Sequence, residues 1–254
     1  MWFHHELRGQ GYRAALTGVA VSDHITGPYK YLRSLRPNAG VWPVNITEEQ
    51  KKAVANESDL KRNSNEFRKT VKEGLYLRRD FEGGQMARDM TLFADRNGKA
   101  YHIHSSEENQ TLHFSELTND YLDFTGRYYR ALPGESNEAP AIFYSKGKYY
   151  MFSSGTTGWR PNPARLSVAK KVTGDWTTTG NPCRGTEEEN KITFGSQSTF
   201  VLPVYGKKNV FIYMGDRWIP ENLADSRYIW LPVEWEDSNP VIRWYPEWDI
   251  NKLK

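Results

Sequence analysis

Residues 142–155 read IFYSKGKYYMFSSG, which is the pattern of a β-hairpin. An apolar run leads into Lys-Gly-Lys, where Gly147 supplies the turn, and an alternating aromatic run then ends in small residues. A single carboxylate, Glu138, stands at the start of the first expected strand, where neutral or β-branched residues are usual. The hairpin predicts antiparallel β-structure, and the isolated carboxylate is a candidate for chemistry.

The hairpin recurs along the chain, and its recurrence indicates a structural repeat. Similar segments are LFADRNGKAYHIHSS at 92–106 and VLPVYGKKNVFIYMGDRW at 201–218. Their central glycines, Gly98 and Gly206, stand roughly 50 to 60 residues from Gly147. A second landmark, Thr-Gly-x-aromatic, occurs at 26–29, 125–128 and 173–176. In the two repeats that hold both landmarks, the distance from hairpin glycine to landmark is nearly the same.

A repeat of this length with about four short strands is typical of a β-propeller blade. The alternation in KAYHIHSS and KYYMFSSG suits strands that bury one face. We therefore predict an all-β fold of the propeller class, with about three and a half blades in residues 1–254, forming the C-terminal portion of a single domain.

Two irregularities qualify this pattern. Residues 38–84 make one repeat too long, and their polar, helix-prone composition with a capping box at Thr47 and Gln50 predicts a largely helical insertion. The hairpin glycine expected to precede Gly27 would lie before Met1, so the chain is expected to begin inside a blade, with the first blade absent.

Composition excludes several function classes. The chain has 254 residues and a net charge of +3 from 34 basic and 31 acidic side chains, a balance that does not predict a nucleic-acid partner. Cys183 is the only cysteine, and no apolar run reaches membrane-spanning length. MWFHHELRGQ does not read as a signal peptide. The histidine pair His102-x-His104 lacks a third ligand, which favours packing over metal binding.

A polar residue recurs at the same position in three repeats, and we call these three residues the slot residues. Asp89, Glu138 and Gln197 each precede the glycine of their hairpin by the same distance, at the start of the first strand. Corresponding strand starts of successive blades face the propeller axis, so we predict that these three side chains point into one cavity.

Several motifs resemble glycoside hydrolase family 43, and most closely its exo-β-1,3-galactanase-like branch. The resemblance extends from Trp2 to Ile250 apart from part of the insertion, and the motifs that carry it are RDMTLFADRNGKAY, NEAPAIFYSKGKYY, SSGTTGWRPNPAR, SQSTFVLP and GDRW. It implies a five-bladed propeller and a secreted or periplasmic, inverting glycosidase that acts on oligo- or polysaccharide, most closely β-1,3-galactan or arabinogalactan.

The resemblance also implies roles for individual residues. Glu138 would be the general acid, Asp89 the carboxylate that tunes it, and Gln197 a group that holds the attacking water. Gln197 cannot take the proton of that water as a neutral amide, so either a third group or an imino-type tautomer of the glutamine would be required. The resemblance further implies sugar contacts from Tyr12, Thr156, Gly158 and Trp159. Many members place a histidine near Gln197 that supports calcium, but TFGSQ has none here, so no metal or cofactor is expected.

Alternatives remain open from the residues alone. Glycines 155 and 158 suit ordinary turns as well as a sugar site. Asp216 and Arg217 suit an ion pair at a blade edge as well as a functional role. A catalytically silent carbohydrate-binding propeller or an inactive fragment competes with the enzyme, and α-L-arabinofuranosidase or β-xylosidase activity competes with galactan hydrolysis. Oligomeric state is not predicted.

Overall fold

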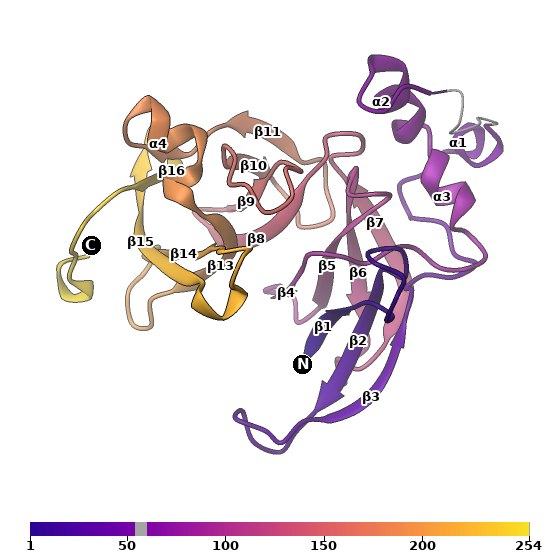
Figure 1. The fold of residues 1–254 in the computed structure, drawn as a ribbon, viewed down its shortest axis with the longest axis horizontal. Coiled ribbons are helices and arrows are strands. Elements are labelled where there is room, and N and C mark those ends of the chain that lie inside the picture. Colours follow the sequence, from indigo (N-terminus) through magenta and orange to yellow (C-terminus); the bar gives the residue numbers. More distant parts are fainter. Residues whose placement is uncertain (54–59, 254) are drawn as a thin grey trace. The chain divides into compact units, whose positions relative to one another are not determined.

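The computed structural model describes residues 1–53 and 60–253, and these form two compact units, 1–136 and 137–254. Each unit contains two β-sheets with short connections between most neighbouring strands. The four sheets follow one another along the chain, and each is built as a propeller blade (Figure 1). The all-β prediction is therefore confirmed.

The first unit begins with a three-stranded antiparallel sheet in the order β1-β2-β3. Its strands are β1 (Trp2–His5), β2 (Leu16–Val21) and β3 (Lys30–Leu35). A four-stranded meander follows in the order β4-β5-β6-β7. Its strands are β4 (Met90–Ala94), β5 (Ala100–Ser106), β6 (Thr111–Leu117) and β7 (Phe124–Ala131).

Helices lie between the two sheets of the first unit in sequence, as predicted for the insertion. They are α1 (Glu48–Lys52), α2 (Asn65–Lys72) and α3 (Leu75–Arg79). Thr47 caps α1 through the capping box with Gln50, and Ser64 caps α2. Residues 54–59 of the predicted insertion lie outside the described residues.

The second unit starts with a four-stranded meander in the order β8-β9-β10-β11. Its strands are β8 (Glu138–Ser145), β9 (Lys148–Ser154), β10 (Arg165–Ala169) and β11 (Thr177–Gly180). The β8–β9 turn has Lys146 and Gly147 with φ angles of 49° and 81°, the left-handed conformation that tight hairpin turns require. The hairpin read from the sequence is thus present at the predicted residues.

A five-stranded sheet completes the second unit in the order β12-β16-β15-β14-β13. Its strands are β12 (Cys183–Arg184), β13 (Gln197–Pro203), β14 (Phe211–Arg217), β15 (Arg227–Glu236) and β16 (Asn239–Arg243). Short helices are α4 (Glu187–Lys191), η2 (Thr193–Gly195), η3 (Leu223–Asp225) and η4 (Ile250–Lys252). The strand β12 pairs in parallel with β16, whereas the other strands are antiparallel.

The two sheets of the second unit share one apolar core. Large side chains from both sheets, including Phe143, Phe152, Tyr213 and Leu231, are almost fully buried in it. Burying such side chains is worth about 1.5–3 kcal/mol each relative to exposure, so this core holds the unit together.

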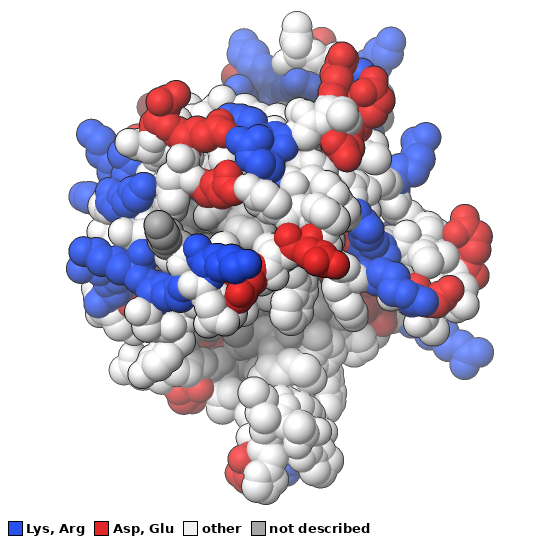
Figure 2. Space-filling view, turned by 90° about the vertical axis from the view of Figure 1, so that its left-hand side faces the viewer, with Lys and Arg blue, Asp and Glu red and all other residues white. Residues whose placement is uncertain are grey.

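Charged side chains are distributed without a dominant sign. Figure 2 shows Lys and Arg side chains interspersed with Asp and Glu side chains on one face. No helix in the described part of the chain is long and apolar enough to cross a membrane.

Candidate active site

The three slot residues occupy equivalent positions in their sheets. Asp89 immediately precedes β4, Glu138 opens β8 and Gln197 opens β13. Each of these strands lies at an edge of its sheet. The prediction that these three residues hold equivalent positions in successive repeats is therefore confirmed, because each stands at the start of the first strand of its hairpin.

The starts of β8 and β13 meet inside the second unit. Glu138 pairs with Ser154 of β9 in the antiparallel register, and the Gln197 Nε2 donates a hydrogen bond to the Ser154 Oγ at 2.9 Å. The neighbouring Ser198 Oγ donates to the Ala139 carbonyl at 2.6 Å. Glu138 and Gln197 are thus both neighbours of Ser154, which is itself buried.

A β-bulge follows the slot residue in both strands. The register shifts between Glu138 and Ala141 in β8, and between Ser198 and Phe200 in β13. Ala139 has a φ of 52°, a left-handed conformation that costs free energy for a residue with a β-carbon. Such bulges redirect side chains at sheet edges next to active sites, and here they follow the residues predicted to do chemistry.

The side-chain amide of Gln197 is held at both ends. Its Nε2 binds Ser154, and its Oε1 accepts a hydrogen bond from the Trp218 Nε1 at 3.2 Å. The Trp218 ring packs edge-on against Trp159, with 5.3 Å between ring centroids. Because both ends of the amide are engaged, the orientation of Gln197 is fixed by its neighbours.

A cavity of about 50 Å³ opens beside this amide. It is lined by two tryptophans, polar side chains and the loop after β9, namely Gly158, Trp159, Arg160, Pro161, Asn162, Gly195, Ser196, Gln197, Asp216 and Trp218. Trp159 and Gly158 were predicted as sugar contacts, and both border the cavity. Thr156 does not line it and is exposed.

The loop after β9 is fixed by one asparagine. Asn162 accepts from the Gly155 N–H at 2.7 Å, and its Nδ2 donates to the Gly155 carbonyl at 3.0 Å and to the Thr157 Oγ1 at 2.8 Å. Gly158 has a φ of 63°, so a left-handed turn carries the chain to Trp159. This arrangement presents Trp159, which is 44% exposed, as an open aromatic surface.

Asp89 and Tyr12 belong to the first unit, and one arginine connects them. Arg88, next to Asp89, donates to the Tyr12 carbonyl at 2.9 Å and to a Glu108 carboxylate oxygen at 3.2 Å. The Asp89 carbonyl accepts from the Ser105 N–H at 2.9 Å. Tyr12 is exposed, and its ring stacks near His4. Convergence of Asp89 with Glu138 and Gln197 stays a prediction.

Two residues of this region, Ser154 and Arg88, were not predicted from the sequence as site residues, because their importance depends on partners distant in the sequence. For Asp216 the sequence left open a functional role and an ion pair with Arg217. The alternative interpretation of Asp216 and Arg217 as an ion pair is wrong, because Arg217 donates to the Phe194 carbonyl at 2.7 Å and forms no ion pair with Asp216 in the described structure. Burial raises the pKa of Asp216 above its ordinary value.

The buried histidines do not form a metal centre. His102 and His104 are fully buried, so the prediction that they pack inside the protein is confirmed. Within residues 1–53 and 60–253, no group of three or more His, Cys, Asp or Glu side chains is placed to hold a metal ion.

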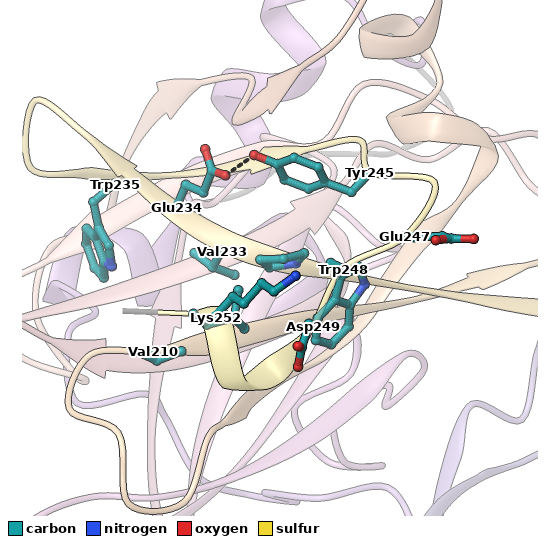
Figure 3. Close-up of a pocket in the computed structure, with 11 residues that line it drawn as sticks. Val210, Val233, Glu234, Trp235, Tyr245, Glu247, Trp248, Asp249 and Lys252 are labelled. Atoms are coloured by element: carbon teal, nitrogen blue, oxygen red, sulfur yellow. Dashed lines mark hydrogen bonds between the residues drawn. The ribbon is translucent and has the colours of Figure 1, made fainter.

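A larger pocket of about 640 Å³ lies at the C-terminal end of the second unit (Figure 3). Tyr245 points toward Glu234 and donates to its carboxylate, whereas Glu247 is directed away from the other labelled side chains. The Trp235 ring is covered by Lys146, whose Nζ lies 3.8 Å from the ring centroid, and by Tyr150. None of the predicted site residues lines this pocket.

The starts of β8 and β13 thus bring an acidic side chain and a fixed amide near one another, and the amide borders a cavity with two tryptophans. The family model for glycosyl hydrolases family 43 matches residues 61–240. The chain belongs to this family, and it is a glycosidase.

Solved structures support the same assignment. The chain is 48% identical to a GH43 β-1,3-galactosidase, BT3683, solved with galactodeoxynojirimycin, with a TM-score of 0.93 over 98% of this chain and 72% of that one. An exo-β-1,3-galactanase from Clostridium thermocellum is 30% identical, with a TM-score of 0.70 over 96% and 44% of the two chains. One from Phanerochaete chrysosporium with galactose is 29% identical, with a TM-score of 0.69 over 95% and 44%. A search of curated proteins gives no match.

Proposed function

We propose that the protein is an inverting, exo-acting glycosidase that removes galactose from β-1,3-linked galactan or arabinogalactan. The observation that carries the proposal is the contact of Glu138 and Gln197 through Ser154, beside a cavity bordered by Trp159 and Trp218. The names of the similar structures, which are β-1,3-galactosidases and exo-β-1,3-galactanases, support galactose as the sugar.

The chemistry assigns different work to the two polar groups. Glu138 protonates the glycosidic oxygen as the bond to the anomeric carbon breaks, while water attacks from the opposite face of the sugar. Gln197, fixed by Ser154 and Trp218, holds that water in place. Trp159 offers its ring to the apolar face of a sugar. No metal or cofactor takes part in this proposal.

Asp89 tunes the acid in the proposed site. A second carboxylate near Glu138 disfavours ionisation of Glu138 and so raises its pKa, which keeps the acid protonated near neutral pH. Tyr12 lies on a loop that Arg88, the neighbour of Asp89, holds in place, and it is proposed to contact the sugar from the same side.

We propose that a further sheet completes the domain. The face of the last sheet that points away from the apolar core carries Phe200 and Trp230, which are 40% and 49% exposed. Ile212 and Met214 on this face pack with Trp248 and Leu253, whereas Phe200 and Trp230 stay partly exposed. The five-bladed ring implied by the family resemblance supports a further blade as the proposed cover, and the chain spans 72% of the β-1,3-galactosidase that it resembles.

Replacing Glu138 by Gln tests the proposed function. The variant keeps the shape of the side chain but loses its proton, so hydrolysis of β-1,3-galactobiose should fall about 10²–10⁴-fold. An aryl β-galactoside with an activated leaving group should be hydrolysed with much less loss, because its departing oxygen needs little protonation. Both rates are measured with Gln197 intact, and the anomer released is identified by NMR.

Three outcomes would contradict the proposal. Equal losses on both substrates would remove the acid role from Glu138. Binding of galactooligosaccharide without any hydrolysis by the unmodified protein would instead indicate a silent carbohydrate-binding propeller. Preference for an arabinofuranoside or a xyloside would reject galactose while keeping the glycosidase.

A further inference from the structure

Asp216 lies directly opposite Gln197 in the antiparallel register of β13 and β14. Opposed residues of an antiparallel pair project their side chains to the same face, with β-carbons about 4.5–5.5 Å apart. Both side chains also line the cavity that contains Trp159 and Trp218. The carboxylate therefore stands beside the amide that is proposed to hold the attacking water.

The surroundings leave this carboxylate available for chemistry. Asp216 is half-buried, and no residue in the described part of the chain pairs with it through a hydrogen bond or an ion pair. A half-buried carboxylate without a partner loses hydration and gains nothing in return, so a structural role does not explain it. Burial raises its pKa, which makes the ionised form a stronger base than an ordinary aspartate.

We propose that Asp216 is the catalytic proton acceptor that deprotonates the water held by Gln197. This assignment rests on the proposed function and supplies the base that a neutral glutamine cannot provide. The two carboxylates stand on different strands of the second unit, because Glu138 opens β8, while Asp216 of β14 lies opposite Gln197. In an inverting site the acid and the base are about 6.5–9.5 Å apart, which leaves room for the water.

The step balances in atoms and charge. A lone pair of the water oxygen forms the new bond to the anomeric carbon, and the electron pair of the glycosidic bond leaves with the glycosidic oxygen. That oxygen takes the proton of Glu138, while a proton of the water passes to the Asp216 carboxylate. Glu138 ends ionised and Asp216 ends protonated, and exchange with solvent restores both.

The charged groups near Asp216 decide which side chain the acidic limb of a pH–activity profile would report. Arg160 borders the same cavity, and Arg217, the next residue on β14, directs its guanidinium to the Phe194 carbonyl. Tyr228 of β15 pairs with Asp216 on the other side, and Gln197 is neutral. The only carboxylate on these neighbouring positions of the described structure is Asp216 itself, so an acidic limb of activity is assigned to it.

The test is Asp216→Asn, measured on β-1,3-galactobiose and on 2,4-dinitrophenyl β-galactoside. We expect kcat to fall about 10²–10⁴-fold on both substrates, because water must be deprotonated whatever the leaving group. Glu138→Gln, in contrast, should lose much less activity on the substrate with the activated leaving group. The acidic limb of kcat/KM, which reports a base that must be ionised, should disappear in the variant. The matched control is Asp225→Asn, which removes an exposed carboxylate paired with Arg227 and should leave both rates unchanged.

Chemical rescue keeps the test independent of folding. With Asp216→Ala, sodium azide should restore turnover of the dinitrophenyl substrate and yield the α-galactosyl azide, since azide needs no deprotonation. If Asp216→Asn hydrolysed galactosides within about threefold of the unmodified rate, or kept the acidic limb, Asp216 would not be the base, but the proposed function would stand. Absence of galactoside hydrolysis by the unmodified protein would reject the proposed function, and the assignment with it.

Discussion

The two units of the chain bury their strands in different ways. In the first unit all seven residues of β5 and all seven of β6 are buried, yet many of them are polar. They include His102, His104 and His113. The core of the second unit consists almost entirely of aromatic and aliphatic side chains, such as Phe143 and Leu231. Both interiors contain buried polar side chains, but those of the first unit include ionisable His, Glu and Arg groups, whereas those of the second unit are Ser, Thr and Asn.

The polar interior of the first unit is built around one ion pair. Glu107 is fully buried and binds Arg130 through two hydrogen bonds of 2.8 Å, and His113 binds the same carboxylate at 2.8 Å. Arg130 also donates to the carbonyls of Val71 and Lys72 near the end of α2. Arg130 thus connects the helical insertion to the sheet. Its hydrogen bonds fix the position of α2 more specifically than an apolar contact would.

The largest expected effect comes from breaking this pair. Arg130→Met removes the cation but keeps much of the volume, leaving the Glu107 carboxylate buried without its partner. We expect a loss of about 3–5 kcal/mol in the free energy of unfolding, measured by denaturant titration.

The matched control is Arg184→Met in the second unit. Arg184 binds Glu236 at 2.7 Å, but both side chains are more than a third exposed, so the loss should stay below about 1 kcal/mol. Equal losses in the two variants would remove the contrast between a buried pair and a surface pair.

A somewhat smaller effect is expected from a cavity in the second unit. Leu231 is 1% exposed and packs in the shared core, so Leu231→Ala should cost about 2–5 kcal/mol. The loss should be the same at pH 7 and pH 5.5, because no titrating group is involved. Hydrogen exchange of peptides from 137–253 would detect the change, and a pH-dependent loss would contradict the account.

Lowering the pH is expected to reduce the stability of the first unit, with a smaller loss for each buried histidine than in the two variants above. Burial lowers the pKa of His102 to about 3 and lowers those of His104 and His113, so these side chains are neutral in the folded state. Below the ordinary pKa of about 6.5, the unfolded chain binds protons that the folded chain does not, and stability falls as pH falls. From pH 6.5 to 5.5 the loss is about 1 kcal/mol each for His102 and His104, whose folded-state pKa values lie far below this range.

Hydrogen exchange can localise this loss. Peptides from β5 and β6 should lose protection at pH 5.5, while those from β8 and β9 should keep it. Glu107 adds to the trend at lower pH, because its partners hold its pKa at about 2 and the contribution is lost as pH falls from the ordinary carboxylate range toward that value. Uniform loss across both units would mean that the histidines do not set the acid response.

Local sequence signals were sufficient for much of the fold. The Lys-Gly-Lys turn, the capping box at Thr47 and the equal placement of the slot residues were readable because each depends on neighbours within a few positions. The resemblance added the family and the roles of Glu138 and Trp159.

Features that depend on distant partners were not readable. No glycine marks the left-handed Ala139, because the bulge is held from outside by Ser198. The histidine pattern predicted packing but not the bond between the His102 and His104 rings, at 2.9 Å between Nδ1 atoms. For Asp216 the sequence left a functional role and an ion pair equally open, and only the cross-strand register showed that it lies opposite Gln197.

The parallel strand β12 has a consequence for synthesis on the ribosome. Cys183 pairs with Ile242, so the chain lays down the outermost strand of the last sheet first and its partner last. At translation rates of about 5–20 residues per second, that strand waits on the order of several seconds for its neighbour. During this interval β13, β14 and β15 can already form a meander, and β16 then joins β15 to β12. The last sheet is therefore completed only when β16 emerges and pairs with both β12 and β15.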